Sequence, residues 1–473
     1  MWHRRALTAV VIIAYTFAAQ PVRATHHVSL GPRFSAARFL RVPLTGRRVR
    51  GITTTSLFHT LFNDFQSEPD GTTYVQTGDI PAMWLRDSSA QTIPYIRFQP
   101  FYPKLRTRFA GVVERNARNI LVDPYANAFL PNYNIWERKW EVDSLSFFVL
   151  LTWVYWSQTR DRTIFTRHVH AALGAIVRTY GCEQEHERCS HYSYPLRLPT
   201  EYNYAGGTGL IWGAFRPSDD AVHYHYNIPQ EMLAAVALRE LAALAEEGYG
   251  DQALTSRALV MSNQIEGGVQ NFGRFYDFRH GWLYVYETNA EGRFDLIDDA
   301  NPPNLLSVPY YGYRNNRDLT YERTRAFVLS PADPYYNRGR YASGLGSAHT
   351  PRGWVWPLGI ISRALTAQTR AETLDSLTTL AETDSEDGLI HESFNPNAYW
   401  RFTRAEFGWA NALYAELIFR SVAGFEDTDF APVRDFLDLE PAAPTPRLTT
   451  PEEQLENALR LTQTLGELLH ELH

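Results

Sequence analysis

The strongest constraint on the fold is the alternation of two kinds of helical segment along the chain. Residues 142–156 are apolar nearly all round, as expected of a buried helix, whereas residues 164–177 are apolar on one side and polar on the other. Helices of the first kind would form an inner ring, and helices of the second kind would wrap it. The alternation predicts an all-α fold of the (α/α)6 toroid type, a six-hairpin barrel. Further helices are predicted at 53–66, 105–121, 228–244, 252–265, 355–366, 371–383 and 404–422.

Strand signals are sparse and short, chiefly at residues 282–287, and long loops rich in Gly, Pro and Asp separate several of the helices. Loops of such length inside a compact domain are usually functional or disordered. Each of them carries one of the motifs described below, which favours a functional role. The loops cover residues 78–82, 201–220, 298–318, 331–353 and 384–400.

The N-terminus has the layout of a secretory signal. Arg4 and Arg5 precede an apolar run at residues 6–19, and Val22-Arg23-Ala24 is a plausible cleavage site. We therefore expect residues 1–24 to be removed and the mature protein to be secreted, with no membrane contact after cleavage. The alternative is an uncleaved membrane anchor.

The C-terminal part of the chain changes composition. Residues 424–449 are acidic and Pro-rich, which is typical of a linker. Residues 450–473 open on a capping box and continue as an amphipathic helix. This helix would either dock on the main domain or mediate self-association, and the sequence does not separate the two.

The chain has two cysteines, Cys182 and Cys189, seven positions apart. In an exported protein this pattern favours one local disulfide. Because His186 and His191 lie nearby, a zinc site is the alternative, although the spacing matches no standard zinc finger.

The stretch Thr77–Gln91, TGDIPAMWLRDSSAQ, gathers the most chemistry-bearing residues. It begins as a loop and is predicted to continue as a helix. Trp84 stands beside the pair Arg86 and Asp87, and this combination is a familiar way to hold a sugar. The ring covers an apolar face of the pyranose while the charged groups bind vicinal hydroxyls. The alternative is a buried salt bridge with a packing Trp.

Seven long motifs, in one order between residues 38 and 423, resemble those of glycoside hydrolase family 125, the inverting exo-α-1,6-mannosidases. The resemblance implies a catalytic domain over residues 38–423 with the toroid fold and a binding site at the mouth where the loops gather. The formal charge of −7 argues against a nucleic-acid partner and agrees with a sugar substrate. The motifs are TGDIPAMWLRDSSAQ, YNIWERKWEVDSL, FRPSDDAVHYHYNIP, LIDDANPPNLLSVPY, GLGSAHTPRGWVWP, LIHESF and FGWANALYAELI.

The resemblance places the general acid in RPSDD, at Asp219 or Asp220. A carboxyl beside another carboxyl has its pKa raised, as a proton donor requires, so the pair suits this role. Of the two we predict Asp219. Asp220 and Arg216 would then bind sugar hydroxyls. The alternative is that either Asp caps the following helix.

The general base implied by the resemblance is Glu392 in LIHESF. His391 and Glu392 do not belong to an H-E-x-x-H zinc motif, because the second His is missing. Glu416 is the second candidate, although its apolar helical setting suits a buried structural acid better.

Further substrate contacts are predicted around these two residues. Trp84, Arg86 and Asp87 would hold the non-reducing mannose. Asp298, Asp299 and Asn301 would take more hydroxyls or simply shape a turn. His349 and Trp354 would line the aglycone side, although a lone His is more often structural. Glu137, Lys139 and Asp143 are expected to form a charged network under the barrel mouth.

These predictions amount to a secreted hydrolase that cleaves terminal α-1,6-linked mannose from mannose-containing oligosaccharides, with inversion and without a metal or cofactor. Two alternatives remain at this point. One is another inverting toroid hydrolase that acts on α-glucosides, and the other is a mannan-binding protein without activity.

Overall fold

The computed structural model of the chain describes residues 52, 55–56, 59–61, 63–99 and 103–421. The predicted signal at 1–24, the linker at 424–449 and the helix at 450–473 lie outside these residues. Among the described residues, no helix is both long enough and apolar enough to cross a membrane.

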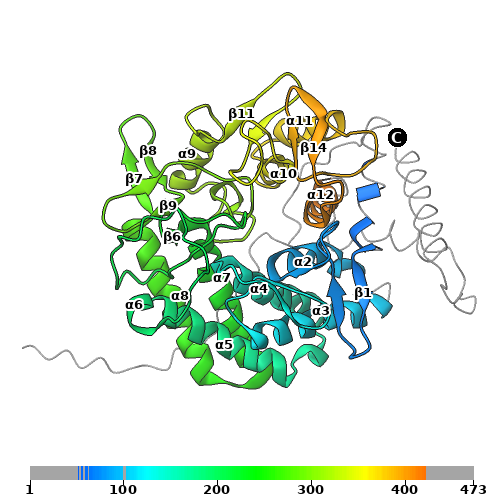
Figure 1. Cartoon of the computed structure of the whole chain (residues 1–473), viewed down its shortest axis with the longest axis vertical. Helices are drawn as coiled ribbons and strands as arrows, with labels where there is room; N and C mark the ends of the chain where they lie inside the picture. The colour runs from blue at the N-terminus through cyan, green and yellow to red at the C-terminus, as the bar shows by residue number, and fades with distance from the viewer. Residues whose placement is uncertain (1–51, 53–54, 57–58, 62, 100–102, 422–473) are drawn as a thin grey trace, which may run out of the picture.

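The fold is rich in helices, and five of them are buried on nearly every side. Neighbouring members of this inner set pack against one another, from α2 to α4 to α7 and from α10 to α12, and α12 returns to α2. Figure 1 shows the helices following one another around the molecule in the order of the sequence. The inner helices are α2 (Leu85–Thr92), α4 (Val142–Thr159), α7 (Ile228–Leu244), α10 (Pro357–Leu365) and α12 (Gly408–Ser421).

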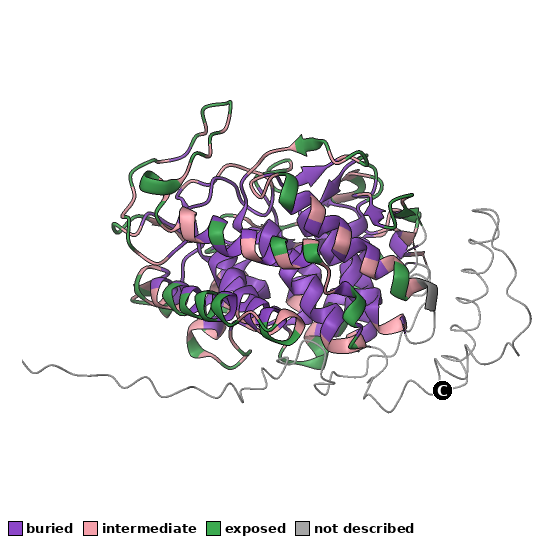
Figure 2. Cartoon of the chain, turned by 90° about the horizontal axis from the view of Figure 1, so that it is seen from below, coloured by how far each residue is buried: buried purple, intermediate pink, exposed green. Residues whose placement is uncertain are grey.

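The remaining long helices lie outside this set and bury one face. In α5, for example, Val169, Leu173, Ile176 and Tyr180 are buried at helical spacing, which is the pattern of a helix covering a core. Figure 2 shows buried residues concentrated in the interior and exposed residues on the outer helices and loops. The outer helices are α3 (Pro103–Val122), α5 (Arg167–Glu183), α8 (Gln252–Phe272), α9 (Leu319–Val328) and α11 (Arg370–Glu382).

The hydrophobic pattern predicted most of these helices correctly. Every residue from Val142 to Trp156 is buried, as the all-round apolar character of that segment requires. Helix α7 has the predicted bounds, and α9 was not predicted. The helix predicted at 53–66 ends before Phe65, which lies in strand β1.

Short antiparallel strands occupy the loops in sheets of two or three strands, so the described chain is not purely helical. Strands of two to six residues are too short to produce a clear alternation in the sequence. They are β1 (Phe65–Ser67) with β2 (Thr73–Val75), β3 (Met83–Trp84) with β4 (Ala128–Phe129) and β5 (Ile135–Glu137), β6 (Tyr226–Asn227) with β9 (Glu287–Thr288) and β10 (Phe294–Asp295), β7 (Arg274–Asp277) with β8 (Gly281–Tyr284), β11 (Tyr336–Arg338) with β12 (Ser343–Leu345), and β13 (Ser393–Asn395) with β14 (Ala398–Thr403).

Short helical turns complete the described chain. The 3-10 turn η4 contacts both α9 and α10, between the inner and outer helices. These turns are η1 (Ile93–Phe98), η2 (Arg162–Ile164), α6 (His186–Cys189), the π turn η3 (Ala245–Tyr249) and η4 (Leu305–Ser307).

The inner helices begin where the strands and loops end, and this arrangement collects polar residues. Trp84 precedes α2 and Glu141 precedes α4, while Asp87 and Asp143 lie in the first turns of these two helices. A helix N-terminus carries unpaired N–H groups and a partial positive charge, so carboxylates are favoured there. The fold therefore presents acidic residues from several helices at one end of the inner set.

The predicted disulfide is present and joins Cys182 to Cys189. It ties the end of α5 to α6. Because both sulfur atoms are in this bond, they are not available as zinc ligands. His186 stacks on Trp212, with ring centroids 3.7 Å apart, and pairs with Glu183 at 2.6 Å.

Candidate active site

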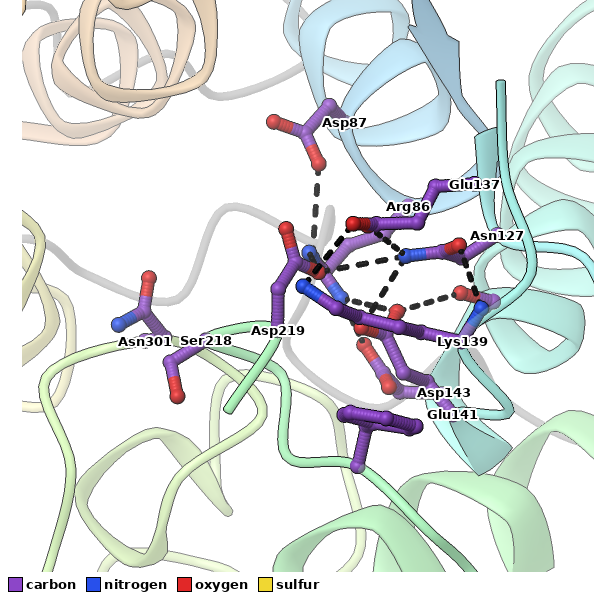
Figure 3. A network of polar contacts seen from close by, with 12 residues as sticks. Arg86, Asp87, Asn127, Glu137, Lys139, Glu141, Asp143, Ser218, Asp219 and Asn301 are labelled. Carbon is purple, nitrogen blue, oxygen red and sulfur yellow. Dashed lines mark hydrogen bonds and ion pairs between the residues drawn. The ribbon is translucent and has the colours of Figure 1, made fainter. Parts of the chain in front are cut away.

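Arg86, in the first turn of α2, is the centre of the largest buried charge cluster in the described chain. Its side chain is 4% exposed. Its Nη1 atom lies 2.7 Å from Oε2 of Glu141 and 3.4 Å from Oδ2 of Asp143, and its Nη2 atom lies 2.9 Å from Oδ1 of Asp219. Its Nε atom lies 3.4 Å from Oδ2 of Asp87. One guanidinium thus holds carboxyls from three separate parts of the chain (Figure 3).

The predicted charged network of Glu137, Lys139 and Asp143 belongs to the same cluster. Lys139 Nζ lies 2.9 Å from Glu137 Oε1. Asn127 donates to Oε2 of Glu137 at 2.9 Å, and it also reaches Glu141 and Asp219 at 3.3 and 3.4 Å. Asn127 therefore links the two ion-paired groups into one network.

The carboxyls of this cluster differ in their pKa values. Burial raises the pKa of Glu141 well above its ordinary value, against the pull of Arg86, and the charge of Asp219 adds to the rise. Burial likewise raises the pKa of Asp143 and of Asp87 to about 6. Among the carboxyls that contact Arg86, burial therefore favours the protonated form most strongly at Glu141.

The pKa of Asp219 is shifted in the opposite direction, so the raised pKa predicted from the sequence was wrong. Burial disfavours its charged form, but Arg86, a hydrogen bond with Glu141 and the charge of Lys139 together lower its pKa below the ordinary value. A raised pKa had been expected from the neighbouring Asp220. The two side chains instead have different partners, since Asp219 binds Arg86 whereas Asp220 accepts from Ser218 at 2.9 Å.

The backbone explains this divergence. Asp219 adopts φ +64°, in the left-handed region that Asp tolerates better than most residues. The turn is closed by hydrogen bonds from Asp219 N to Arg216 O at 2.9 Å and from Arg216 N to Asp220 O at 2.7 Å. The predicted helix-capping alternative is not observed at α7, whose N-cap residue is Asn227. The Asp219 side chain remains 18% exposed.

His349 links the Asp219–Asp220 turn electrostatically to Glu392. His349 Nδ1 lies 3.6 Å from Asp220 Oδ1. The neighbouring carboxyl of Asp220 raises the pKa of His349 to about 9 against the effect of burial, with smaller contributions from Asp219 and Glu392. The predicted acid pair and the predicted base therefore all act electrostatically on one imidazole.

The setting of Glu392 suits a base. It is 6% exposed and directly precedes β13, and burial raises its pKa above the ordinary value while Arg404 opposes the rise. Its Oε1 atom lies 4.0 Å from Nη1 of Arg404. A carboxylate with a raised pKa takes up a proton more readily near neutral pH than an ordinary one.

Arg404 was missed by sequence reasoning, because it follows β14 with no motif of its own. Its Nε atom lies 2.7 Å from Asp79 Oδ1, and its Nη2 donates to Thr77 O at 2.6 Å. It therefore joins the loop at Thr77–Asp79 to the β13–β14 hairpin, which Glu392 directly precedes. Gly78 permits the close approach, since an added Cβ would lie 2.2 Å from Glu406 O.

Several residues predicted to bind sugar have structural partners instead. Arg216 forms a two-pronged ion pair with Glu287, at 2.6 and 2.8 Å, inside the protein. Asp298 is fully buried and accepts from Leu305 N and Leu306 N at 2.8 and 2.9 Å, so it shapes the η4 turn.

The neighbouring pair Asp299 and Asn301 is also engaged within its loop. Asp299 accepts from Asn301 Nδ2 at 2.8 Å and from Ser347 Oγ at 2.7 Å. The turn alternative therefore accounts for the contacts of this motif.

Trp84, whose ring was predicted to cover a sugar face, is only 6% exposed and packs with Ala82 and Ala128. Its indole Nε1 has no hydrogen-bond partner among the described residues. Trp354, the other predicted aromatic contact, is half-buried.

Glu416, the second candidate for the base, is fully buried between Arg97 and Arg420 at 2.5 Å each, which supports its structural role.

A family model described as metal-independent alpha-mannosidase (GH125) matches residues 48–135 and 130–419. The chain belongs to glycoside hydrolase family 125. It is accordingly a glycosidase of the α-mannosidase type, as the motifs predicted.

Two relatives are each about one third identical to this family 125 chain over the aligned residues. It is 34% identical, over 392 residues, to the "Meiotically up-regulated gene 157 protein" of Schizosaccharomyces pombe, covering 73% of this chain and 76% of that one. It is also 34% identical to a Streptococcus pneumoniae metal-independent α-mannosidase in a non-productive complex with α-1,6-mannobiose, with a TM-score of 0.75, covering 83% of this chain and 95% of that one.

A more distant structure shares the fold alone. A wild-type glycosidase is 14% identical to this family 125 α-mannosidase, with a TM-score of 0.54, and covers 80% of this chain and 98% of that one. Among the described residues, no group of three or more His, Cys, Asp or Glu side chains is arranged to hold a metal ion.

Proposed function

We propose that the protein removes terminal α-1,6-linked mannose from the non-reducing end of oligosaccharides, with inversion of the anomeric centre. The observation that carries this proposal is that a family 125 chain holds Asp220 of the Asp219–Asp220 turn 3.6 Å from His349, while Asp219 and Glu392 both act electrostatically on the same imidazole. The α-1,6 linkage is supported by the mannobiose in the streptococcal relative, which is similar over 83% of this chain.

We further propose that the ring of helices is the six-hairpin toroid expected from the sequence. In this arrangement η4 would occupy the inner position between α7 and α10, because it packs on α9 and α10. The helical residues described between 52 and 63 would be the outer partner of α12. The six inner members would then be α2, α4, α7, η4, α10 and α12.

Asp219 remains our candidate for the acid. Arg86 and Asn127 both bind its Oδ1 atom, so its Oδ2 atom is the one that would face the leaving oxygen. Its exposed fraction of 18% gives a substrate access to it, whereas Glu141 and Asp143 are fully buried. Asp220, 29% exposed beside His349, is the second candidate.

Glu392 would be the general base. In an inverting glycosidase the acid protonates the glycosidic oxygen while the base removes a proton from the water that attacks the opposite face of the ring. The water oxygen bonds to the anomeric carbon as the bond to the leaving oxygen breaks. The α-mannoside thus yields β-mannose. The raised pKa of Glu392 suits proton removal near neutral pH.

The non-reducing mannose would be held by polar groups of four residues that the sequence analysis singled out. Trp84 offers its unpartnered indole N–H, and Asp87, with its pKa of about 6, offers a carboxyl at the start of α2. Asp220 and the imidazolium of His349 would bind further hydroxyls. Arg86 would hold the neighbouring carboxyls in position rather than bind the sugar itself.

We also propose export of the protein, because the predicted signal at residues 1–24 agrees with the disulfide between Cys182 and Cys189. Disulfides persist in oxidising compartments and are rare in the cytosol.

A panel of disaccharides tests the proposed activity. We expect release of mannose from α-1,6-mannobiose and at least about tenfold slower release from the α-1,2 and α-1,3 isomers, since a site built to bind hydroxyls rejects misplaced ones. Cleavage of maltose in preference to every mannobiose would show an α-glucoside hydrolase. Binding of mannobiose without any cleavage would show a mannan-binding protein.

A further inference from the structure

We infer that Glu141 is a positioning residue that supplies the proton of Asp219 during glycoside hydrolysis, an inference that rests on the function proposed above. Neither the sequence motifs nor the carboxyl pair expected of an inverting glycosidase requires this residue. It is nevertheless fully buried at the heart of the network in Figure 3.

The geometry ties Glu141 to Asp219 through shared partners. Arg86 binds Glu141 Oε2 with Nη1 at 2.7 Å and Asp219 Oδ1 with Nη2 at 2.9 Å. Asn127 Nδ2 reaches Glu141 Oε1 at 3.3 Å and Asp219 Oδ1 at 3.4 Å. The shared donors hold the two carboxyls side by side, and a hydrogen bond between them shifts the pKa of both, upward for Glu141 and downward for Asp219.

Two touching carboxyls cannot both be ionised without strong repulsion, so one of them keeps a proton. Glu141 is fully buried whereas Asp219 is 18% exposed, and burial penalises a charge more on the buried group. Glu141 is therefore the donor and the Asp219 carboxylate the acceptor of their hydrogen bond.

The charge balance of the whole cluster points the same way. Two cations face five carboxyls, so at least part of the acidic side must hold protons in a buried site. The groups are Arg86 and Asp87 of α2, Glu137 and Lys139 next to β5, Glu141 and Asp143 at the start of α4, and Asp219 of the turn.

This arrangement resolves a difficulty in the acid assignment, because Asp219 is ionised in the unliganded protein and cannot donate a proton that it does not hold. In the proposed step, the proton of Glu141 passes to Asp219 and from Asp219 to the glycosidic oxygen as the C–O bond breaks. Glu392 takes the proton of the attacking water. Glu141 ends as a carboxylate held by Arg86 and by Ser144 Oγ at 3.0 Å. Solvent exchange afterwards returns one proton to Glu141 and removes one from Glu392.

The variant Glu141→Gln tests this step, because an amide keeps the size and the hydrogen-bond donor but has no proton to give. We expect kcat for α-1,6-mannobiose to fall by about 100-fold or more, with KM changed by less than about threefold. For α-mannosyl fluoride, whose leaving group needs little protonation, kcat should fall by less than about tenfold. The basic limb of the kcat–pH profile for the disaccharide should also move to lower pH.

The matched control is Asp143→Asn, which removes a neighbouring carboxyl of the Arg86 cluster without touching the hydrogen bond between Glu141 and Asp219. It should lower turnover of the two substrates by similar factors. An equal loss on both substrates in Glu141→Gln would mean a structural role and overturn the inference, and so would an unchanged kcat.

A measurement on the unmodified protein covers the case in which the Gln variant folds poorly. Carbon-13 NMR of glutamate-labelled protein should show the carboxyl of Glu141 protonated at pH 7. An ionised Glu141 at pH 7 would overturn the inference directly. This readout does not require turnover, so it separates a failure of the inference from a failure of the proposed activity.

Discussion

The Nη2 atom of Arg86 lies 2.9 Å from the Oδ1 atom of Asp219, across 133 positions of sequence. This contact joins the first turn of α2 to the turn that closes between Arg216 and Asp220. It also fixes the Oδ1 atom of Asp219, which Asn127 binds as well. The charge of Arg86, enclosed on nearly all sides, therefore organises the acidic side of the site.

Replacement of Arg86 by Ala should leave several buried carboxyls without their counter-ion. Breaking a buried ion pair from one side costs about 3–5 kcal/mol of unfolding free energy. Urea denaturation followed by far-ultraviolet circular dichroism would measure the loss. The control is Arg293→Ala, whose pair with Glu201 is 64% and 38% exposed and should contribute at most about 1 kcal/mol. Equal midpoints for the two variants would contradict the central place given to Arg86.

Replacement of Asp219 by Asn should remove the proton donor. We expect turnover of α-1,6-mannobiose to fall by about 100-fold or more, while the affinity for the disaccharide changes little. Steady-state kinetics and calorimetric titration give the two quantities. Asp220→Asn is the matched comparison from the same turn. If Asp220→Asn loses the larger factor and Asp219→Asn retains activity, the acid is Asp220.

The helices were largely predictable from the sequence. The inner ones are buried on every side and are therefore apolar all round. Val142–Trp156 had to be interior on composition alone, and the outer helix α5 shows the expected one-sided pattern. Helix α9 carries a weaker pattern and was missed. The strand signal at 282–287 was correct in part, since β8 covers Gly281–Tyr284. The other short strands were missed, because segments such as Met83–Trp84 are too brief to show a period.

The members of the candidate site were predictable as residues but not as partners. Asp219 and Asp220 were treated as one electrostatic unit because they are adjacent in sequence, and the left-handed backbone at Asp219 separates their side chains. Arg216 offered no sequence sign of its pairing with Glu287. Such pairings join distant segments, so only the folded chain reveals them.

Replacement of Glu392 by Gln should abolish activation of the attacking water, because an amide cannot accept the proton. Hydrolysis of α-1,6-mannobiose should fall by about 100-fold or more. Turnover of mannosyl fluoride by this variant should recover on addition of azide, a nucleophile that needs no base. Glu416→Gln makes an informative comparison, because Glu416 is a buried structural acid. It should lower stability without any recovery by azide, and undiminished hydrolysis in Glu392→Gln would end the assignment of the base.

His349 should titrate with a pKa of about 9, above the ordinary value of 6.5, because the carboxyl of Asp220 lies 3.6 Å away. Since the folded pKa is raised, the pair stabilises the protein fully below about pH 6.5 and loses this contribution as pH rises through about 9. Proton NMR of the imidazole would follow the titration. Asp220→Asn should lower the pKa toward 6.5. A His349 that already titrates near 6.5 in the unmodified protein would contradict this contact.

The most direct test of the proposed activity is proton NMR of α-1,6-mannobiose during digestion, before the released sugar mutarotates. Inversion predicts that β-mannose appears first, because the water activated by Glu392 attacks the face opposite to the leaving oxygen. Early α-mannose would show a retaining mechanism. That result would contradict the assignment of Glu392 as the base and of Asp219 as its partner acid.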